Sequence, residues 1–116
     1  MSQNNHIDLI EFPSDSIEDL QASKKFFTQV FDWKFQDWGD DYADTKDSGI
    51  SSGFIADPQG KGSMPLTVVY VDDLEAAHKK VVDAGGTITK ETFSFPGGRR
   101  FHFKDPAGHE LAAWSK

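Results

Sequence analysis

Two basic side chains near the C-terminus have the spacing of a ligand-contact pair. Arg100 and His102 lie two residues apart in a segment, 99–104, in which polar and apolar residues alternate. Alternation with a period of two is typical of a half-buried strand, so both side chains should project from one face. A guanidinium can hold a carboxylate or phosphate through two parallel hydrogen bonds, and an imidazole titrates near neutral pH. The pair therefore predicts a contact site for a small organic anion.

Aromatic residues in two neighbouring segments could complete such a site. Asp105-Pro106-Ala107-Gly108 has turn chemistry, because Pro fixes φ at the second position and Gly tolerates positive φ at the fourth. The strand expected from His109 then brings Trp114, and the β-branched strand at 66–71 brings Tyr70. Both rings could stack on a ligand, and both could equally serve as packing.

Glu11 is a candidate general base, provided that burial raises its pKa. A structural partnership with a cation is the more common role of such a residue, and Arg100 could pair with Glu11 or with Glu110. His102 could also be an ordinary surface histidine. The candidate ligand-contact residues are therefore Glu11, Tyr70, Arg100, His102 and Trp114, and no catalytic residue is assigned.

The other polar clusters predict less. A metal site built from His6, His78 and His109 has little support in their placement. The aspartates between 37 and 47 lack the glycine and terminal glutamate of an EF-hand, so a solvated hairpin edge explains them better. The chain has no cysteine, which excludes disulfides, a thiolate nucleophile and cysteine-based zinc sites.

Length and charge narrow the classes of partner. The 116 residues suffice for one compact domain. A net charge of −7 argues against nucleic-acid and anionic-membrane partners. No apolar run is long enough for a membrane span, and residues 1–5 do not resemble a signal peptide. A cytoplasmic protein is expected.

The expected order of strands and helices repeats along the chain. Asp19-Leu20-Gln21-Ala22 and Asp73-Leu74-Glu75-Ala76 match at two expected helix starts. A Pro- and Gly-rich linker at 58–63 separates module 1, about 5–57, from module 2, about 64–116. Module 1 should contain a strand at 6–12, a helix capped by Asp15 or Ser16 and ending near 31, and strands at 33–38, from 42 and at 50–56. Module 2 should contain a strand at 66–71, a helix at 74–84 capped by Gly85-Gly86, and strands at 87–93, 99–104 and 109–114.

Two βαβββ modules in so short a chain resemble the vicinal oxygen chelate superfamily, which includes glyoxalase I, bleomycin resistance proteins and extradiol dioxygenases. The segments that carry the resemblance are Ile10-Glu11-Phe12-Pro13, the stretch 26–33, Ala84-Gly85-Gly86 and the stretch 103–108. The resemblance implies an α+β fold in which curved mixed sheets surround a cup and helices cover the convex side. It also implies a homodimer.

Alternation along the strands separates two faces, and the resemblance places one face beneath the helices and the other towards the cup. Residues beneath the helices should be Ile10, Phe12, Phe101, Phe103, Leu111 and Ala113, with Phe27 and Val81 buried on the helices themselves. Residues facing the cup should be Leu9, Glu11, Arg100, His102, Glu110, Ala112 and Trp114.

The metal site of this family is not matched. Its usual ligands are two histidines and a glutamate, and the aligned positions hold Leu9, Leu66 and Ala112. Shifting the alignment by one residue does not restore the set. None of these three side chains can coordinate a divalent ion, so neither a metal nor another cofactor is expected.

Three functions remain open at this point. The first hypothesis is a metal-free protein that binds a small organic anion in the cup. The second is a lyase, isomerase or dioxygenase that uses a metal held by unrecognised ligands. The third is a non-catalytic regulatory or interaction domain whose cup is filled by side chains.

Overall fold

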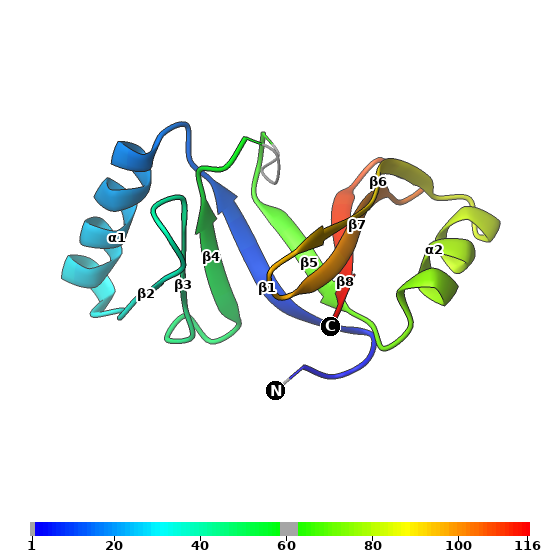
Figure 1. The fold of residues 1–116 in the computed structure, drawn as a ribbon, viewed down its shortest axis with the longest axis horizontal. Helices are drawn as coiled ribbons and strands as arrows, with labels where there is room; N and C mark the ends of the chain where they lie inside the picture. The colour runs from blue at the N-terminus through cyan, green and yellow to red at the C-terminus, as the bar shows by residue number, and fades with distance from the viewer. Residues whose placement is uncertain (1, 59–62) are drawn as a thin grey trace. The chain divides into compact units, whose positions relative to one another are not determined.

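The computed structural model describes residues 2–58 and 63–116, and within them the chain forms eight strands and two helices (Figure 1). Residues 59–62 of the predicted linker lie outside the described residues. The order is β1 (His6–Pro13), α1 (Ile17–Phe31), β2 (Gln36–Asp37), β3 (Tyr42–Thr45), β4 (Ser51–Ile55), β5 (Leu66–Tyr70), α2 (Leu74–Asp83), β6 (Thr87–Phe95), β7 (Gly98–Lys104) and β8 (Glu110–Ser115).

The chain divides into two compact units. Leu9–Leu66 forms one, here called the α1 unit, and Thr67–Lys116 together with the residues up to Asp8 forms the other, the α2 unit. Strand β1 therefore begins in the α2 unit and continues in the α1 unit.

Both units have the same strand order. In the α1 unit, β1 pairs in parallel with β4, and β4, β3 and β2 continue as antiparallel neighbours. In the α2 unit, β5 pairs in parallel with β8, and β8, β7 and β6 continue in the same way. A parallel pair requires a crossover, which each helix provides. The predicted α+β fold of two βαβββ repeats is confirmed.

Helix α1 covers an aromatic core. Ser16 caps the helix by accepting a hydrogen bond from the Asp19 backbone N–H at 3.0 Å. Leu20 is the buried residue of the helix, and it packs with three buried residues of the sheet and the following turn, Ala43, Phe54 and Ala56. Phe12, Phe27 and Phe35 pack against this cluster and are only partly buried. The prediction that Phe27 is buried was therefore too strong, because its ring lies at the edge of the core.

Helix α2 covers a largely aliphatic core. Asp73 caps it by accepting from the Ala76 N–H at 3.0 Å, and Gly85 ends it at a φ of 95° that disfavours other residues. The buried cluster contains one aromatic ring, Phe101, which is 0% exposed and packs with Val71, Leu74 and Ala113. Phe103 and Val81 pack against the cluster but are half-buried, so Val81 also falls short of the predicted burial.

The predicted strand at 33–38 was too long, since β2 contains only Gln36–Asp37. Trp33 stacks on Phe27 at 5.0 Å between ring centroids, and the Lys34 N–H donates to the Asp47 carboxylate at 2.9 Å. These contacts replace the strand pairing that the residues would otherwise make. Among the described residues, neither helix combines the length and apolarity needed to cross a bilayer.

Candidate functional site

Four of the five predicted contact residues lie in one unit and on one face of its sheet. Tyr70 pairs with Trp114 across β5 and β8, and Trp114 pairs with Arg100 across β8 and β7. Directly paired residues share a face, so these side chains form a row across the sheet, which Phe93 of β6 extends beyond Arg100. His102 lies two residues along β7 from Arg100 and therefore on the same face. We call this face of the α2 unit, opposite the helix, the basic–aromatic face.

Arg100 and His102 contact each other directly. The Arg100 Nε–H donates to His102 Nε2 at 3.2 Å, and each residue is only 6% exposed. Burial, together with the charges of Arg100 and Lys90, lowers the pKa of His102 to about 4. The imidazole is therefore neutral at pH 7, and because Nε2 accepts a hydrogen bond, its proton lies on Nδ1.

An aromatic ring lies between the basic groups. The Phe93 ring centroid is 5.5 Å from the Arg100 guanidinium carbon, 4.6 Å from Lys90 Nζ and 5.7 Å from the His102 ring. Contacts of a cation with the face of a ring are favourable by about 0.5–1 kcal/mol at exposed sites and more when desolvated. Phe93 therefore helps to hold two positive charges near each other.

Trp114 is fixed by its polar edge. Its Nε1–H donates to the Asp8 carboxylate at 3.1 Å, and its ring centroid lies 5.0 Å from that of Tyr70 and 6.1 Å from that of Phe95. The planes of Trp114 and Tyr70 are inclined at 72°, an edge-to-face arrangement. The two predicted aromatic residues thus lie in direct contact.

Glu11 belongs to the α1 unit. It lies in β1, pairs with Gly53 of β4, and is only 2% exposed. A Cβ at Gly53 would overlap the hydroxyl end of Tyr42, so the absence of a side chain at Gly53 lets the tyrosine lie against β4. Glu11 is thus a buried carboxyl group in the sheet of its own unit.

Sequence reasoning missed Lys90, Phe93 and Asp8 as neighbours of the site. Strand β6 has register shifts between Ile88 and Lys90 and between Lys90 and Phe93. A strict period of two places Lys90 and Phe93 on opposite faces, whereas the irregular register brings both to Arg100 and His102. No signal in the sequence marks these shifts.

The three positions aligned with the family's metal ligands do not fit a metal. Ala112 is 0% exposed and pairs with His102 on one side and Val68 on the other, so it contributes only a methyl group. Leu66 is 3% exposed, and Leu9 is likewise aliphatic. Among residues 2–58 and 63–116, no three His, Asp or Glu side chains lie close enough together to hold a metal ion.

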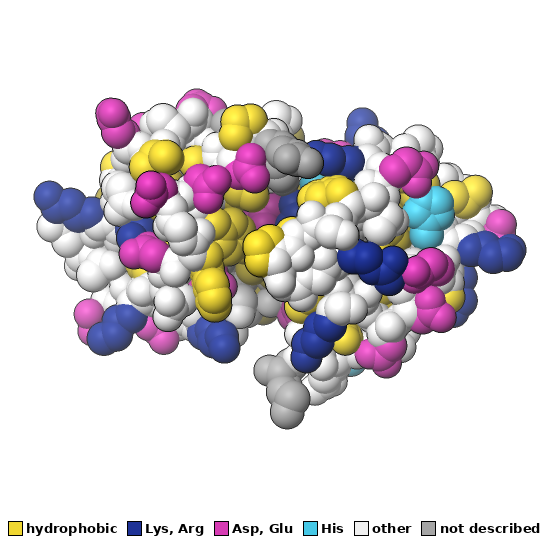
Figure 2. All heavy atoms as spheres, viewed as in Figure 1, with side chains coloured by type: hydrophobic (Ala, Val, Ile, Leu, Met, Phe, Trp, Pro, Cys, Tyr) yellow, Lys and Arg dark blue, Asp and Glu magenta, His cyan; other side chains and the backbone are white. Residues whose placement is uncertain are grey.

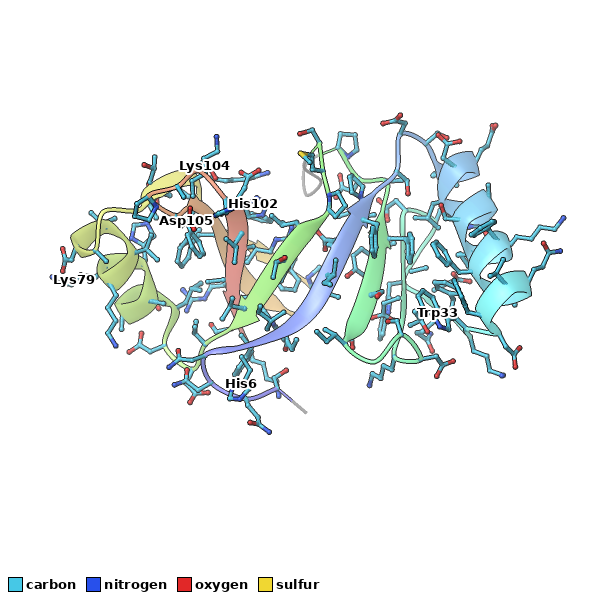
Figure 3. The ribbon with its side chains drawn as sticks, turned by 180° about the vertical axis from the view of Figure 1, so that it is seen from behind. His6, Trp33, Lys79, His102, Lys104 and Asp105 are labelled. Atoms are coloured by element: carbon cyan, nitrogen blue, oxygen red, sulfur yellow. The ribbon has the colours of Figure 1, made fainter. Side chains whose placement is uncertain are left out.

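The remaining polar features are local. In Figure 3, His102 and Lys104 come from β7, and Asp105 lies at the turn that follows. Asp105 accepts from the backbone N–H groups of Ala107 and His109, which closes the predicted turn. In the α1 unit, an open groove of about 410 Å³ is lined by Lys34, Phe35, Gln36, Trp38 and residues 44–47.

Two mycobacterial proteins are similar to this chain in sequence. The chain is 31% identical over 107 residues to the protein named "Putative glyoxylase CFP32" from Mycobacterium bovis and from Mycobacterium tuberculosis. The match covers 83% of this chain and 41% of those relatives, so the chain spans about two fifths of their length.

Two solved structures have the same fold. A glyoxalase/bleomycin resistance protein/dioxygenase superfamily member from Vibrio splendidus matches with a TM-score of 0.68 and 18% identity, covering 93% of this chain and 97% of that one. A structure described as an NAD-dependent benzaldehyde dehydrogenase from Legionella pneumophila matches with a TM-score of 0.75 and 18% identity, covering 92% and 96%. The sequence model of the Glyoxalase/Bleomycin resistance protein/Dioxygenase superfamily matches residues 16–113. The chain therefore belongs to this superfamily.

Proposed function

We propose that the protein binds a small organic anion with a planar or apolar body, without a metal ion, at the basic–aromatic face. The observation that carries the proposal is the contact between Arg100 and His102 beside the aromatic row. The cup implied by the resemblance is part of the same proposal. No catalytic role is assigned to any residue.

Each group has a distinct part in binding. Arg100 supplies a positive charge, and its hydrogen bond to His102 orients the guanidinium. His102 is neutral near pH 7 and offers Nδ1–H as a hydrogen-bond donor. Trp114 and Tyr70 provide the aromatic surface for the body of the ligand.

The test is a calorimetric titration with benzenesulfonate, a planar anion that stays ionised across the accessible pH range. Arg100→Ala should weaken binding by roughly 1.5–3 kcal/mol, the range for charge-assisted hydrogen bonds. His102→Ala should also weaken it. Arg99→Ala is the matched control, because Arg99 is the adjacent arginine and pairs with Glu75 of α2 at 2.8 Å. Equal affinities for the parent, Arg100→Ala and His102→Ala would refute the proposed site.

The pH dependence of this binding follows from the lowered pKa of His102. An anion beside the imidazole favours its protonated form, so affinity should stay level from pH 8 to about 6 and rise as the pH approaches 4. His102→Ala should remove that rise.

The second candidate function is a metal-dependent lyase, isomerase or dioxygenase, favoured by the 31% identity to proteins named as glyoxylase. The metal-free proposal predicts a different result from this candidate. Protein purified without metal-affinity resin or chelator should carry far less than one equivalent of zinc, nickel, iron or manganese by mass spectrometry. A stoichiometric metal that survives dialysis and is lost on substitution of the basic–aromatic face would favour the enzyme. Failure of every anion to raise the melting temperature would instead favour a regulatory or interaction domain.

The homodimer and the cytoplasmic location stay predictions, and light scattering tests the homodimer.

A further inference from the structure

We infer that Asp8 selects ligands that carry one anionic group and have an uncharged or cationic opposite end. This inference rests on the proposed function, because it concerns the specificity of the same face. Asp8 lies in the α2 unit, at the point where β1 leaves it.

The Asp8 carboxylate joins two segments through its two oxygens. Oδ1 accepts from Trp114 Nε1–H at 3.1 Å, and Oδ2 accepts from the Ser2 hydroxyl at 2.8 Å. Two donors on one carboxylate fix its orientation. Asp8 is therefore a positioning residue for the indole as well as a fixed negative charge.

The segment that precedes β1 is itself anchored to the α2 unit. Asn4 Oδ1 accepts from the Asp72 backbone N–H at 2.8 Å, and the Asn5 N–H donates to the Tyr70 carbonyl at 2.8 Å. Asn5 adopts a left-handed conformation, with φ at 66°, which turns the chain towards β1. These bonds hold the segment against the end of β5, next to the aromatic pair.

The basic–aromatic face is therefore positively charged at one end of its row of side chains and negatively charged at the other. Lys90 and Arg100 flank Phe93 at the β6–β7 side, whereas Asp8 contacts Trp114, which lies on the β5 side of Arg100. Glu110, which shares a strand face with Trp114, accepts from Thr89 at the opposite end of β8. An anion whose charged group meets Arg100 and whose body lies on Trp114 therefore extends towards a negative charge.

That arrangement favours a monoanion over a dianion. A second anionic group at the Trp114 end would meet Asp8 and lose part of the attraction gained at Arg100. An uncharged end avoids this repulsion, and a cationic end would gain from the carboxylate.

The test compares benzenesulfonate with benzene-1,3-disulfonate by calorimetric titration. Parent protein should bind the monosulfonate more tightly than the disulfonate. Asp8→Asn, which keeps an oxygen acceptor for Trp114, should raise the disulfonate-to-monosulfonate affinity ratio roughly threefold to tenfold. Asp83→Asn is the matched control, because it removes one carboxylate from the exposed end of α2, and it should leave the ratio unchanged. Asp8→Glu, which retains the charge, should keep the parent's preference.

A second readout follows the indole directly. In a 15N-correlated NMR spectrum, assigned with Trp114→Phe, the Trp114 Nε1–H resonance should shift upfield in Asp8→Ala and stay near its parent position in Asp8→Asn. An unchanged affinity ratio in Asp8→Asn, with both probes still bound, would overturn the inference and leave the proposed function standing. An unshifted resonance in Asp8→Ala would overturn the positioning role. If neither probe binds the parent, the proposed function fails and the inference falls with it.

Discussion

The two units share a strand order and differ in what their sheets carry. The α1 unit, Leu9–Leu66, contains eleven acidic and five basic side chains, whereas the rest of the chain contains eight and seven. Figure 2 shows several Asp and Glu side chains over the visible face of the α1 unit. On the sheet face opposite each helix, the α1 unit buries the carboxyl group of Glu11, and the α2 unit buries Arg100 and His102. The repeat therefore preserves topology and leaves the chemistry of that face free to diverge.

The cores beneath the helices differ as well. In the α1 unit, rings continue from the buried Phe54 through Phe27, 5.6 Å away, to Phe31, which is 57% exposed. In the α2 unit, Phe101 is fully buried and surrounded mainly by aliphatic side chains. A helix-facing surface needs apolar volume, which either composition provides.

The largest expected effect tests this contrast between a buried ring and a surface ring. Phe101→Ala should lower the free energy of unfolding by about 3–5 kcal/mol, because it removes a fully buried aromatic and leaves a cavity. Phe31→Ala, at the exposed end of the ring series, should cost less than about 1 kcal/mol. Urea denaturation of both variants measures the difference. Equal losses would show that the two cores depend on aromatic packing in the same way.

The pH dependence of the free energy of unfolding should show a smaller effect that distinguishes the two units. The pKa of His102 is lowered from 6.5 to about 4, so below pH 6.5 the unfolded state binds its proton more readily than the folded state. The contribution of neutral His102 to the free energy of unfolding should be fully present above pH 6.5. It should fall by about 3 kcal/mol as the pH drops to 4. Leu9–Leu66 contains no histidine, so this loss should arise in the α2 unit.

His102→Gln should flatten the stability profile between pH 6.5 and 4, as measured by denaturation at each pH. Two carboxyl groups of the α2 unit titrate lower. Pairing with Arg99 lowers the pKa of Glu75, and hydrogen bonds from His109 lower the pKa of Asp105. Their contributions are lost only below their ordinary values of 4.5 and 3.8, outside most of the histidine window. A parent-like slope in His102→Gln would assign the titration to another group.

The smallest expected effect lies at the helix ends. Helix α1 ends at Asp32 with φ at 58°, and α2 is followed by Gly85 with φ at 95°. Because a side chain in this region is strained, Asp32→Gly should stabilise the protein by about 0.5 kcal/mol, and Gly85→Ala should destabilise it by about 1 kcal/mol. Thermal unfolding checks both signs. A loss in Asp32→Gly would mean that contacts of the aspartate outweigh its backbone strain.

The sequence predicted what depends on local chemistry. The cap at Asp15 or Ser16, the cap at Gly85-Gly86, the turn at 105–108 and the shared face of Phe101 and Ala113 follow from residue type and periodicity. The structure confirms them, with Ser16 as the residue that caps α1. The alternation of β7 also placed Arg100 and His102 on one face, since that strand is regular.

The rest depended on contacts that periodicity does not encode. The expected strand at 33–38 shortened because Trp33 packs on a helix residue and Lys34 bonds to a side chain thirteen residues away. Lys90 and Phe93 joined the site through register shifts. Asp8 reached Trp114 across 106 residues of sequence, a distance over which no local pattern operates.

The split of β1 between units bears on how this gene could be divided. The α2 unit includes residues up to Asp8. Three of these residues form hydrogen bonds with the rest of that unit, to Tyr70, Asp72 and Trp114. A fragment that begins after the first repeat loses all of these partners. The second half of a split reporter cut between the repeats should therefore need residues 2–8 supplied from the first half to reach its full stability.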